Sequence, residues 1–203
     1  MTTEELLERY AAGERDFSGA NLSGELIGLD LQGINLSGAY LLVYFERSNL
    51  SNANFQSAGI ADCGFMEANL SGANLSEAIL SESNFEGAIL IGADLRKSQM
   101  IRTSLGGASL VDADLRSANL ESADLASASL VDADLRNANL ESANLARANL
   151  TGANLVGADL RNTKLRDANL TYTNLAGVDL SVAILCNTLM PDGTFREKTL
   201  RLN

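Results

Sequence analysis

The chain has 203 residues, of which 26 are acidic and 15 are basic, and its formal net charge at pH 7 is −11. This charge argues against nonspecific binding to nucleic acids or anionic membranes, because both need a basic surface. The chain contains no histidine and therefore lacks the commonest general base and metal ligand. No apolar run resembles a signal peptide or approaches the roughly 18 residues of a membrane span. We therefore expect a cytoplasmic protein with one domain.

Residues 2–13 predict the one helix of the chain. Thr2 and Glu5 match a capping box, and Gly13 suits the end of a helix. Three apolar residues at helical spacing would share one face: Leu6, Leu7 and Tyr10. We assign residues 1–14 to an N-terminal capping helix that covers the end of the following domain, with docking of a partner as the alternative.

A five-residue phrase begins at Phe17 and continues almost to the C-terminus. Its apolar residue is here named position i. From Phe45 to Leu185 the register never breaks, and position i is always Leu, Phe, Ile or Met. Position i−2 is Ala, Ser, Thr, Cys or Val throughout. Gly, Asn, Asp and Ser are common at i+2, where a tight turn needs residues that tolerate unusual backbone angles. A period of five matches neither an α-helix nor a plain strand.

Residues 111–130 and 131–150 show the phrase at its most regular. They read VDADLRSANLESADLASASL and VDADLRNANLESANLARANL, and they are identical at 16 of 20 positions. Each block contains four copies of Ala-(Asp/Asn/Ser)-Leu-x-x. Repeats of this kind indicate an array of stacked units, and the near-identity of the two blocks indicates that one block is one unit.

These phrases make the chain similar to the pentapeptide-repeat family over nearly its whole length. The resemblance implies an all-β fold, a right-handed quadrilateral parallel β-helix with four phrases per coil and with positions i and i−2 facing inward. Residues 15–190 would then form about nine coils. The chemistry agrees with this placement, because neither position carries a charge between Phe45 and Leu185. Three residues 20 apart are expected to stack inside the solenoid: Phe45, Phe65 and Phe85.

Two interruptions of the register lie near the N-terminal end of the array. With Leu26 at position i, the coils that end at Leu41 and Ile60 each have 19 residues and are short at the same corner. The second interruption contains an unusually apolar segment, Leu42-Val43-Tyr44. This feature predicts either a bulge or bend shared by two coils or a recognition surface, with Tyr44 as the best candidate for an exposed aromatic residue.

Residues 191–203 are assigned to a C-terminal turn and cap. Pro191-Asp192-Gly193 predicts a turn, after which Phe195 and Leu200 could fold back over the last coil. Residues 6–17 and 190–193 resemble the ends of cyanobacterial pentapeptide proteins, including the suppressor of heterocyst differentiation. This resemblance concerns the ends and favours a lineage more than a function.

Polar residues that could carry chemistry are better explained as structure. Asp94, Asp114 and Asp134 form one column with an arginine two residues after each, which predicts a solvated Asp–Arg ladder rather than a metal or catalytic site. Cys63 and Cys186 lie about six coils apart and cannot form a disulfide, which needs Cα atoms within about 7 Å. We therefore predict no catalytic, cofactor-binding or metal-binding residues, and no cofactor.

A second apolar column follows the repeat itself. Ile91, Val111 and Val131 are 20 residues apart at position i+1 and should point outward, either as ordinary surface or as a strip of an interface. The candidate partner-binding surface therefore consists of five residues: Tyr44, Val43, Ile91, Val111 and Val131.

The function predicted from the sequence is that of a non-enzymatic rod that binds a protein partner, in a regulatory role. A monomer is expected rather than a dimer. The alternative is a DNA-mimicking binder and inhibitor of DNA gyrase, similar to the Qnr members of the family. Acidity favours this alternative, but residues 1–90 carry 13 acids and 3 bases, whereas residues 151–203 carry 5 and 6. An enzyme is disfavoured, because the sequence has neither a phosphate-binding loop nor metal-ligand spacing.

Overall fold

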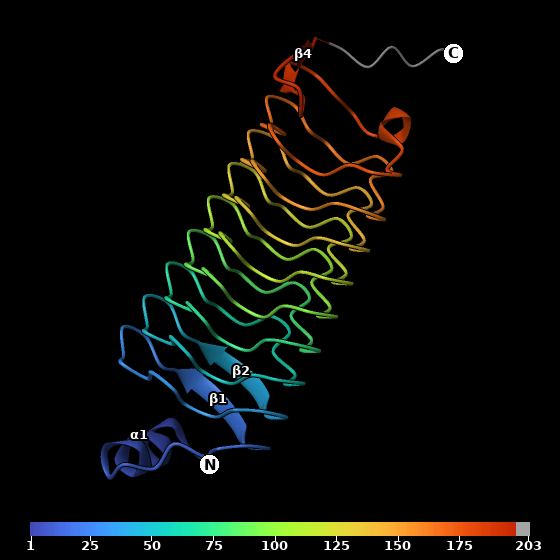
Figure 1. Cartoon of the computed structure of the whole chain (residues 1–203). Helices are drawn as coiled ribbons and strands as arrows, with labels where there is room; N and C mark the ends of the chain where they lie inside the picture. The colour runs from blue at the N-terminus through green and yellow to red at the C-terminus, as the bar shows by residue number, and fades with distance from the viewer. Residues whose placement is uncertain (198–203) are drawn as a thin grey trace.

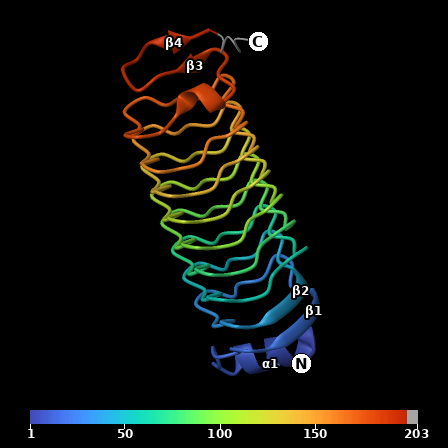
Figure 2. The ribbon, with the colours of Figure 1, turned by 90° about the vertical axis from the view of Figure 1, so that its right-hand side faces the viewer.

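The structure, a computed structural model, describes residues 1–197. It is a rod of stacked coils (Figure 1) with helix α1 (Thr3–Ala11) at one end. The short antiparallel strands β3 (Thr188–Leu189) and β4 (Phe195–Arg196) lie at the other end, as Figure 2 shows from the side. No helix among residues 1–197 is long and apolar enough to cross a membrane.

Parallel backbone bridges connect each coil to the next. From Tyr44 onward the paired residues are 20 apart, and the bridges form columns that begin with Tyr44–Gly64, Asn49–Asn69, Asn54–Asn74 and Gly59–Ile79. The step of 20 continues to the pair Asn169–Leu189. This spacing agrees with the repeat unit that the near-identical blocks predict, and it makes the rod a parallel β-helix.

The phrase around Leu110 shows why five residues form one side of a coil. The backbone N–H groups of Leu110 and Asp112 donate to Ser129 and Val131 of the next coil, at 2.7 and 3.0 Å. The N–H of Ala113 turns back to the carbonyl of Leu110 at 3.1 Å and closes a tight turn. Most backbone polar groups of the phrase are thereby paired without long strands, as a buried backbone requires.

The corners of the coils use the left-handed region of backbone space at position i+2. Asp112 has φ of 56°. The sequence therefore correctly indicated that position i+2 needs residues that tolerate unusual backbone angles. The structure also holds Glu67, Lys97 and Tyr172 there, with φ of 58–60°. Such residues cost about 1–2 kcal/mol each in this region. The hydrogen bonds to neighbouring coils and the buried position i offset that cost.

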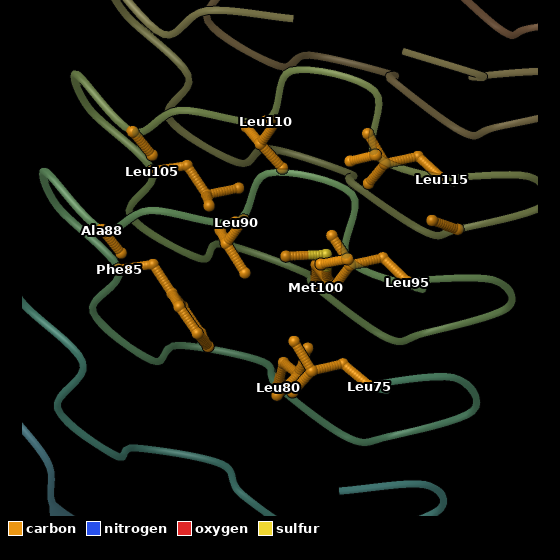
Figure 3. Close-up of a cluster of buried hydrophobic side chains, with 14 of the residues drawn as sticks. Leu75, Leu80, Phe85, Ala88, Leu90, Leu95, Met100, Leu105, Leu110 and Leu115 are labelled. Carbon is orange, nitrogen blue, oxygen red and sulfur yellow. The ribbon is translucent and has the colours of Figure 1, made fainter. Parts of the chain in front are cut away.

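The interior is a continuous apolar column of position i side chains, part of which is drawn in Figure 3. The predicted phenylalanine stack is confirmed. The rings of Phe45 and Phe65 are 5.2 Å apart, and those of Phe65 and Phe85 are 4.5 Å apart and nearly parallel. Phe55 meets the first two rings edge-on at 6.1 Å. Aromatic pairs in these geometries add about 0.5–1.5 kcal/mol beyond the burial of their area.

Most of the small polar residues at position i−2 are buried with a hydrogen-bond acceptor in the preceding coil, whereas Ser98 donates to the carbonyl of Leu95 in its own coil. The hydroxyl of Thr163 donates to the carbonyl of Leu140 at 2.8 Å, and Ser83 donates to Ile60 at 2.6 Å. The thiol of Cys63 makes the equivalent contact with Leu41 at 3.2 Å. This pattern explains why serine, threonine and cysteine can replace alanine inside the rod.

Helix α1 covers the first coil. Thr2 is its N-cap and accepts a hydrogen bond from the N–H of Glu5 at 3.1 Å. Leu6 is fully buried against the core, and the hydroxyl of Tyr10 donates to the carbonyl of Gln32 at 2.9 Å. The predicted helix is therefore present, and its apolar face closes the end of the rod.

The C-terminal end departs from the phrase. Residues Leu180–Val182 form the 3₁₀ helix η1, and Leu175 and Leu180 are only half-buried because no later coil within residues 1–197 covers them. Strand β4 returns to pair with β3, but Phe195 is 63% exposed, so its side chain does not act as the expected lid. Leu200, the other residue expected in that lid, lies outside the described residues.

Candidate docking surface

Strands β1 (Asn21–Glu25) and β2 (Tyr40–Tyr44) form where the register is interrupted. They pair in parallel, with Leu22 opposite Leu41, and Leu26 occupies a buried position i as proposed for the short coils. Phe45 follows Leu41 by four positions instead of five, so the chain runs straight where other phrases turn. The expectation of a bulge or bend is therefore wrong for β2: the missing residue removes a corner and leaves an extended strand there, which pairs with β1, where Gly24 has φ of 124°.

An extended strand sends alternate side chains to opposite faces, and this decides the role of β2. Leu41 and Val43 point into the rod, whereas Tyr40, Leu42 and Tyr44 point outward. Val43 is only 1% exposed, so its assignment to a partner-binding surface is wrong. Tyr44 is exposed, which agrees with its expected outward position.

The outward side chains of β2 gather exposed apolar groups on one face of the rod. Tyr40 is 70% exposed and Leu42 66%, while Tyr44 and Ile79 are each 51% exposed. These four residues are here named the apolar patch. Beside Tyr40 and Leu42 lies an open groove of about 370 Å³, whose lining comprises Asn21, Tyr40, Leu41, Leu42, Gly59, Ala61 and Ile79. Exposed apolar groups gathered in this way are typical of interaction sites rather than of ordinary surface.

Two glycines in the next coil make room for the tyrosine rings. A Cβ atom on Gly59 would lie 3.3 Å from Cδ1 of Tyr40. On Gly64 it would collide with Oε1 of Glu46 and lie 2.9 Å from Cδ1 of Tyr44. Neither glycine is among the residues with positive φ. The space above them, rather than backbone freedom, therefore explains these glycines, and it lets both rings lie against the adjacent coil.

Glu46 borders the apolar patch in an unusual environment. The backbone carbonyl of Glu46 accepts a hydrogen bond from the N–H of Gly28 in the preceding coil. The N–H of the next residue, Arg47, donates to the carbonyl of Met66 in the following coil. Glu46 therefore lies in one column between Ile27 and Met66. Both of these apolar side chains are partly exposed. Oxygen Oε2 of Glu46 is the one buried side-chain nitrogen or oxygen without a hydrogen-bond partner in the described part of the chain. Buried polar atoms are rarely left in this state.

The second apolar column predicted from the sequence is present but separate. Ile91 is 43% exposed, and Val111 and Val131 above it are half-buried. Leu42 lies in the column of Ala61 and Ser81, and Ile91 follows Ser81 by half a coil. The structure therefore does not bring Ile91, Val111 and Val131 together with Tyr44.

The predicted Asp–Arg ladder is confirmed. Arg116 binds Asp114 through Nε and Nη2 at 2.8 and 2.6 Å and approaches Asp134 of the next coil at 3.7 Å. Arg96 and Arg136 bind their own aspartates in the same way. The hydrogen bond from Arg136 holds the pKa of Asp134 below its usual value. A groove of about 360 Å³ runs along these arginines. Their charges are balanced by the aspartates, so the groove is not a strong anion site.

The cysteines and carboxylates show no reactive arrangement. Cys63 is buried, Cys186 is half-buried, and both are free thiols. Burial raises the pKa of Cys63, which disfavours its nucleophilic thiolate form. Within residues 1–197, no group of three or more His, Cys, Asp and Glu side chains is arranged to hold a metal ion.

Sequence reasoning missed three members of the apolar patch: Tyr40, Leu42 and Ile79. The alternation in Tyr40-Leu41-Leu42-Val43-Tyr44 is the signal of a half-buried strand and could have identified Tyr40 and Leu42 as outward and Val43 as inward. Ile79 could be found only by counting two successive coils onward from Tyr40, the shorter one to Gly59 and then a full one.

Comparisons with known proteins agree with this architecture. Eight copies of the model for pentapeptide repeats match within residues 68–188. HetL, a pentapeptide repeat protein involved in heterocyst differentiation regulation from Nostoc sp. strain PCC 7120, is 32% identical; 97% of this chain and 100% of HetL are covered, with a TM-score of 0.38. No curated protein matches the sequence.

A trypsin-treated form of QnrB1, a plasmid-mediated fluoroquinolone resistance protein, is 17% identical, with 91% of this chain and 92% of QnrB1 covered and a TM-score of 0.65. At that identity the likeness shows the fold alone. Pentapeptide repeat proteins fold as right-handed β-helices. Because the family model matches more than half of the sequence, the chain belongs to the family of pentapeptide repeat proteins.

Proposed function

We propose that this chain is a non-enzymatic rod that binds another protein through the apolar patch, in a regulatory role in the cytoplasm. The rod would be a monomer with the quadrilateral cross-section and about nine coils expected from the sequence. The observation that carries the proposal is the outward face of β2, where Tyr40, Leu42 and Tyr44 are exposed together.

The patch has the properties of an interaction hot spot. Tyrosine is enriched among residues that dominate binding energy, and it offers a large contact area with few rotatable bonds. The rings of Tyr40 and Tyr44 also lie against the next coil, because Gly59 and Gly64 have no side chain in that space. A rigid apolar surface loses little conformational entropy when it binds, which favours affinity.

A second candidate is inhibition of DNA gyrase through mimicry of DNA. The acidic N-terminal half of the rod favours it, because residues 1–90 contain 13 acids and 3 bases. Two features favour the first proposal instead. The acidity does not continue along residues 151–203, and a DNA mimic has no evident use for an exposed face of tyrosine and leucine.

The test compares three full-length proteins as baits in a lysate of the organism that encodes the chain. They are the parent, a patch variant with Leu42→Asp and Tyr44→Asp, and a control with Tyr172→Asp and Phe195→Asp, which changes exposed apolar residues elsewhere. We expect a partner that the parent and control recover equally and the patch variant recovers at least about 10-fold less.

Recovery of the same proteins by all three baits would contradict the proposal, provided that circular dichroism shows each bait folded. The purified parent is also added to a gyrase supercoiling assay, where we expect no inhibition at micromolar concentration. Inhibition there that persists in the patch variant would favour the second candidate.

A further inference from the structure

The acidic residues around the apolar patch define the chemistry of its partner, and this step rests on the function proposed above. We propose that the patch binds a protein segment that carries a large apolar side chain flanked by lysine or arginine. The apolar side chain enters the groove beside Tyr40 and Leu42, and the basic side chains reach the surrounding carboxylates.

The part of the rod that carries the patch is strongly acidic. Residues 16–90 contain nine acidic side chains and one basic side chain, Arg47. Three of the acids lie directly at the patch. Glu25 is paired with Tyr44 across β1 and β2, Glu46 lies beside the ring of Tyr44, and Asp62 follows the groove residue Ala61. These three residues, Glu25, Glu46 and Asp62, are here named the acidic rim.

The acidic rim lacks internal cations. Within residues 1–197, the carboxylates of the rim take part in no ion pair, whereas Glu77 and Glu82 bind Lys97 and Arg102. Oε2 of Glu46 is also buried without a donor. Glu46 is itself only partly buried, so a small rotation of its side chain would bring this oxygen to a donor on a bound partner. A lysine or arginine would supply that donor.

The tyrosines add a second attraction for cations. In the described chain, the cation–π contacts join Arg9 to Phe17 and Arg15 to Tyr10, both near α1. The rings of Tyr40 and Tyr44 have no such contact and are more than half exposed. A basic side chain is attracted to the face of an exposed aromatic ring. The tyrosines therefore reinforce the preference for a basic segment.

The same charges disfavour the other occupants of an apolar surface. Two copies of this chain that met through their patches would bring two acidic rims together, and like charges that face each other across an interface repel. An anionic membrane would be repelled for the same reason. A segment with both apolar and basic side chains can fill the groove and pair with the carboxylates of the acidic rim at the same time.

The first experiment selects random dodecapeptides, displayed on phage, on the immobilised full chain. The selected peptides should combine Leu, Ile or Phe with Lys or Arg. The strongest peptide is then synthesised with a fluorescent label, and its dissociation constant is measured by anisotropy at low and at physiological salt. Because exposed charges are screened by salt, its binding should weaken as salt rises.

Three variants separate the contributions to binding. A patch variant with Tyr40→Ser and Leu42→Ser should weaken binding at least about 10-fold. A rim variant with Glu25→Gln, Glu46→Gln and Asp62→Asn should weaken it at least about 5-fold and reduce its salt dependence. A control with the same loss of charge elsewhere should bind within about 2-fold of the parent; it carries Asp112→Asn, Glu121→Gln and Asp132→Asn.

The outcomes distinguish this inference from the function on which it rests. Selected peptides without basic residues, or equal binding by the rim variant and the parent, would overturn the basic partner and leave the docking patch intact. Peptides that bind the patch variant as tightly as the parent would overturn both. Sedimentation equilibrium is run in parallel, and a dimer that Leu42→Ser dissociates would show that a second copy occupies the patch.

Discussion

Glycines serve two different purposes in this rod, and the difference is clearest at Gly64 and Gly107. Gly107 has φ of +64° and nothing within 4 Å of an added Cβ, so its role is conformational. Gly64 lacks a positive φ, but its missing side chain is the space that Glu46 and Tyr44 occupy. One residue type therefore shapes a corner of the rod in one place and a candidate docking surface in the other.

Gly64→Ala should displace the Tyr44 ring with little effect on stability. The added methyl collides with flexible side chains that can move, and the substitution also reduces the entropy of the unfolded chain. We expect the free energy of unfolding to change by less than about 1 kcal/mol, while the NMR signals of the Tyr44 ring shift.

Gly107→Ala is the matched control for this change. It should destabilise the chain by about 1 kcal/mol through backbone strain and leave the Tyr44 signals unchanged. If Gly64→Ala left the ring signals in place, the glycine would not be what positions Tyr44.

At the scale of elements, the ends of the rod differ more than its middle. Helix α1 buries Leu6 completely and closes the first coil, whereas η1 and the pair β3–β4 leave Leu175 and Leu180 half-buried at the other end. Strands β1 and β2 stand apart from both because they replace a corner by a flat face. The elements that depart from the repeat are therefore the ones that give this rod its individual surface.

Leu6→Ala tests whether α1 is a structural cap. Removal of a fully buried leucine side chain should lower the free energy of unfolding by about 2–5 kcal/mol, measured by urea denaturation. Leu7→Ala, at a half-buried position of the same helix, should cost clearly less. A stability equal to the parent in Leu6→Ala would indicate that the helix serves a partner rather than the rod.

Across the whole molecule, stability arises from contacts between neighbouring coils. Bridges and hydrogen bonds connect equivalent positions of successive coils along the rod, so each coil is supported by the coils directly above and below it. In such an array the stability is approximately a sum of repeat and interface contributions. A change that preserves the step from one coil to the next should therefore be tolerated, and one that breaks it should not.

Deletion of residues 131–150 should leave a folded, shorter rod, because residue 151 then takes the place of residue 131 in its column. We expect the same circular dichroism spectrum and a urea m-value lower by about a tenth, in proportion to the surface lost. Deletion of residues 131–133 should instead misplace every later position i and lower stability by more than about 3 kcal/mol. Equal tolerance of both deletions would contradict a fold held in register by its columns.

The amino-acid sequence determined the repeating part of this protein. The near-identical blocks correctly predicted a step of 20, and the spacing of the repeat predicted the stack of Phe45, Phe65 and Phe85 and the Asp–Arg ladder. The parallel β-helix itself was implied by the resemblance of the five-residue phrases to the pentapeptide-repeat family. These features depend on residues that recur at one spacing, so local pattern and tertiary contact coincide. The sequence also located the interruption near Tyr44.

Only the tertiary structure decided what that interruption does. Whether a missing residue produces a bend or a strand depends on hydrogen bonds to the adjacent coil, and β1 with β2 satisfy them by running straight. That choice turns Val43 inward and Tyr40 outward, and it places Ile79 beside Tyr40 although two coils of chain separate them. The patch and its acidic rim are assembled from successive coils, because stacking places side by side residues that are distant in the chain.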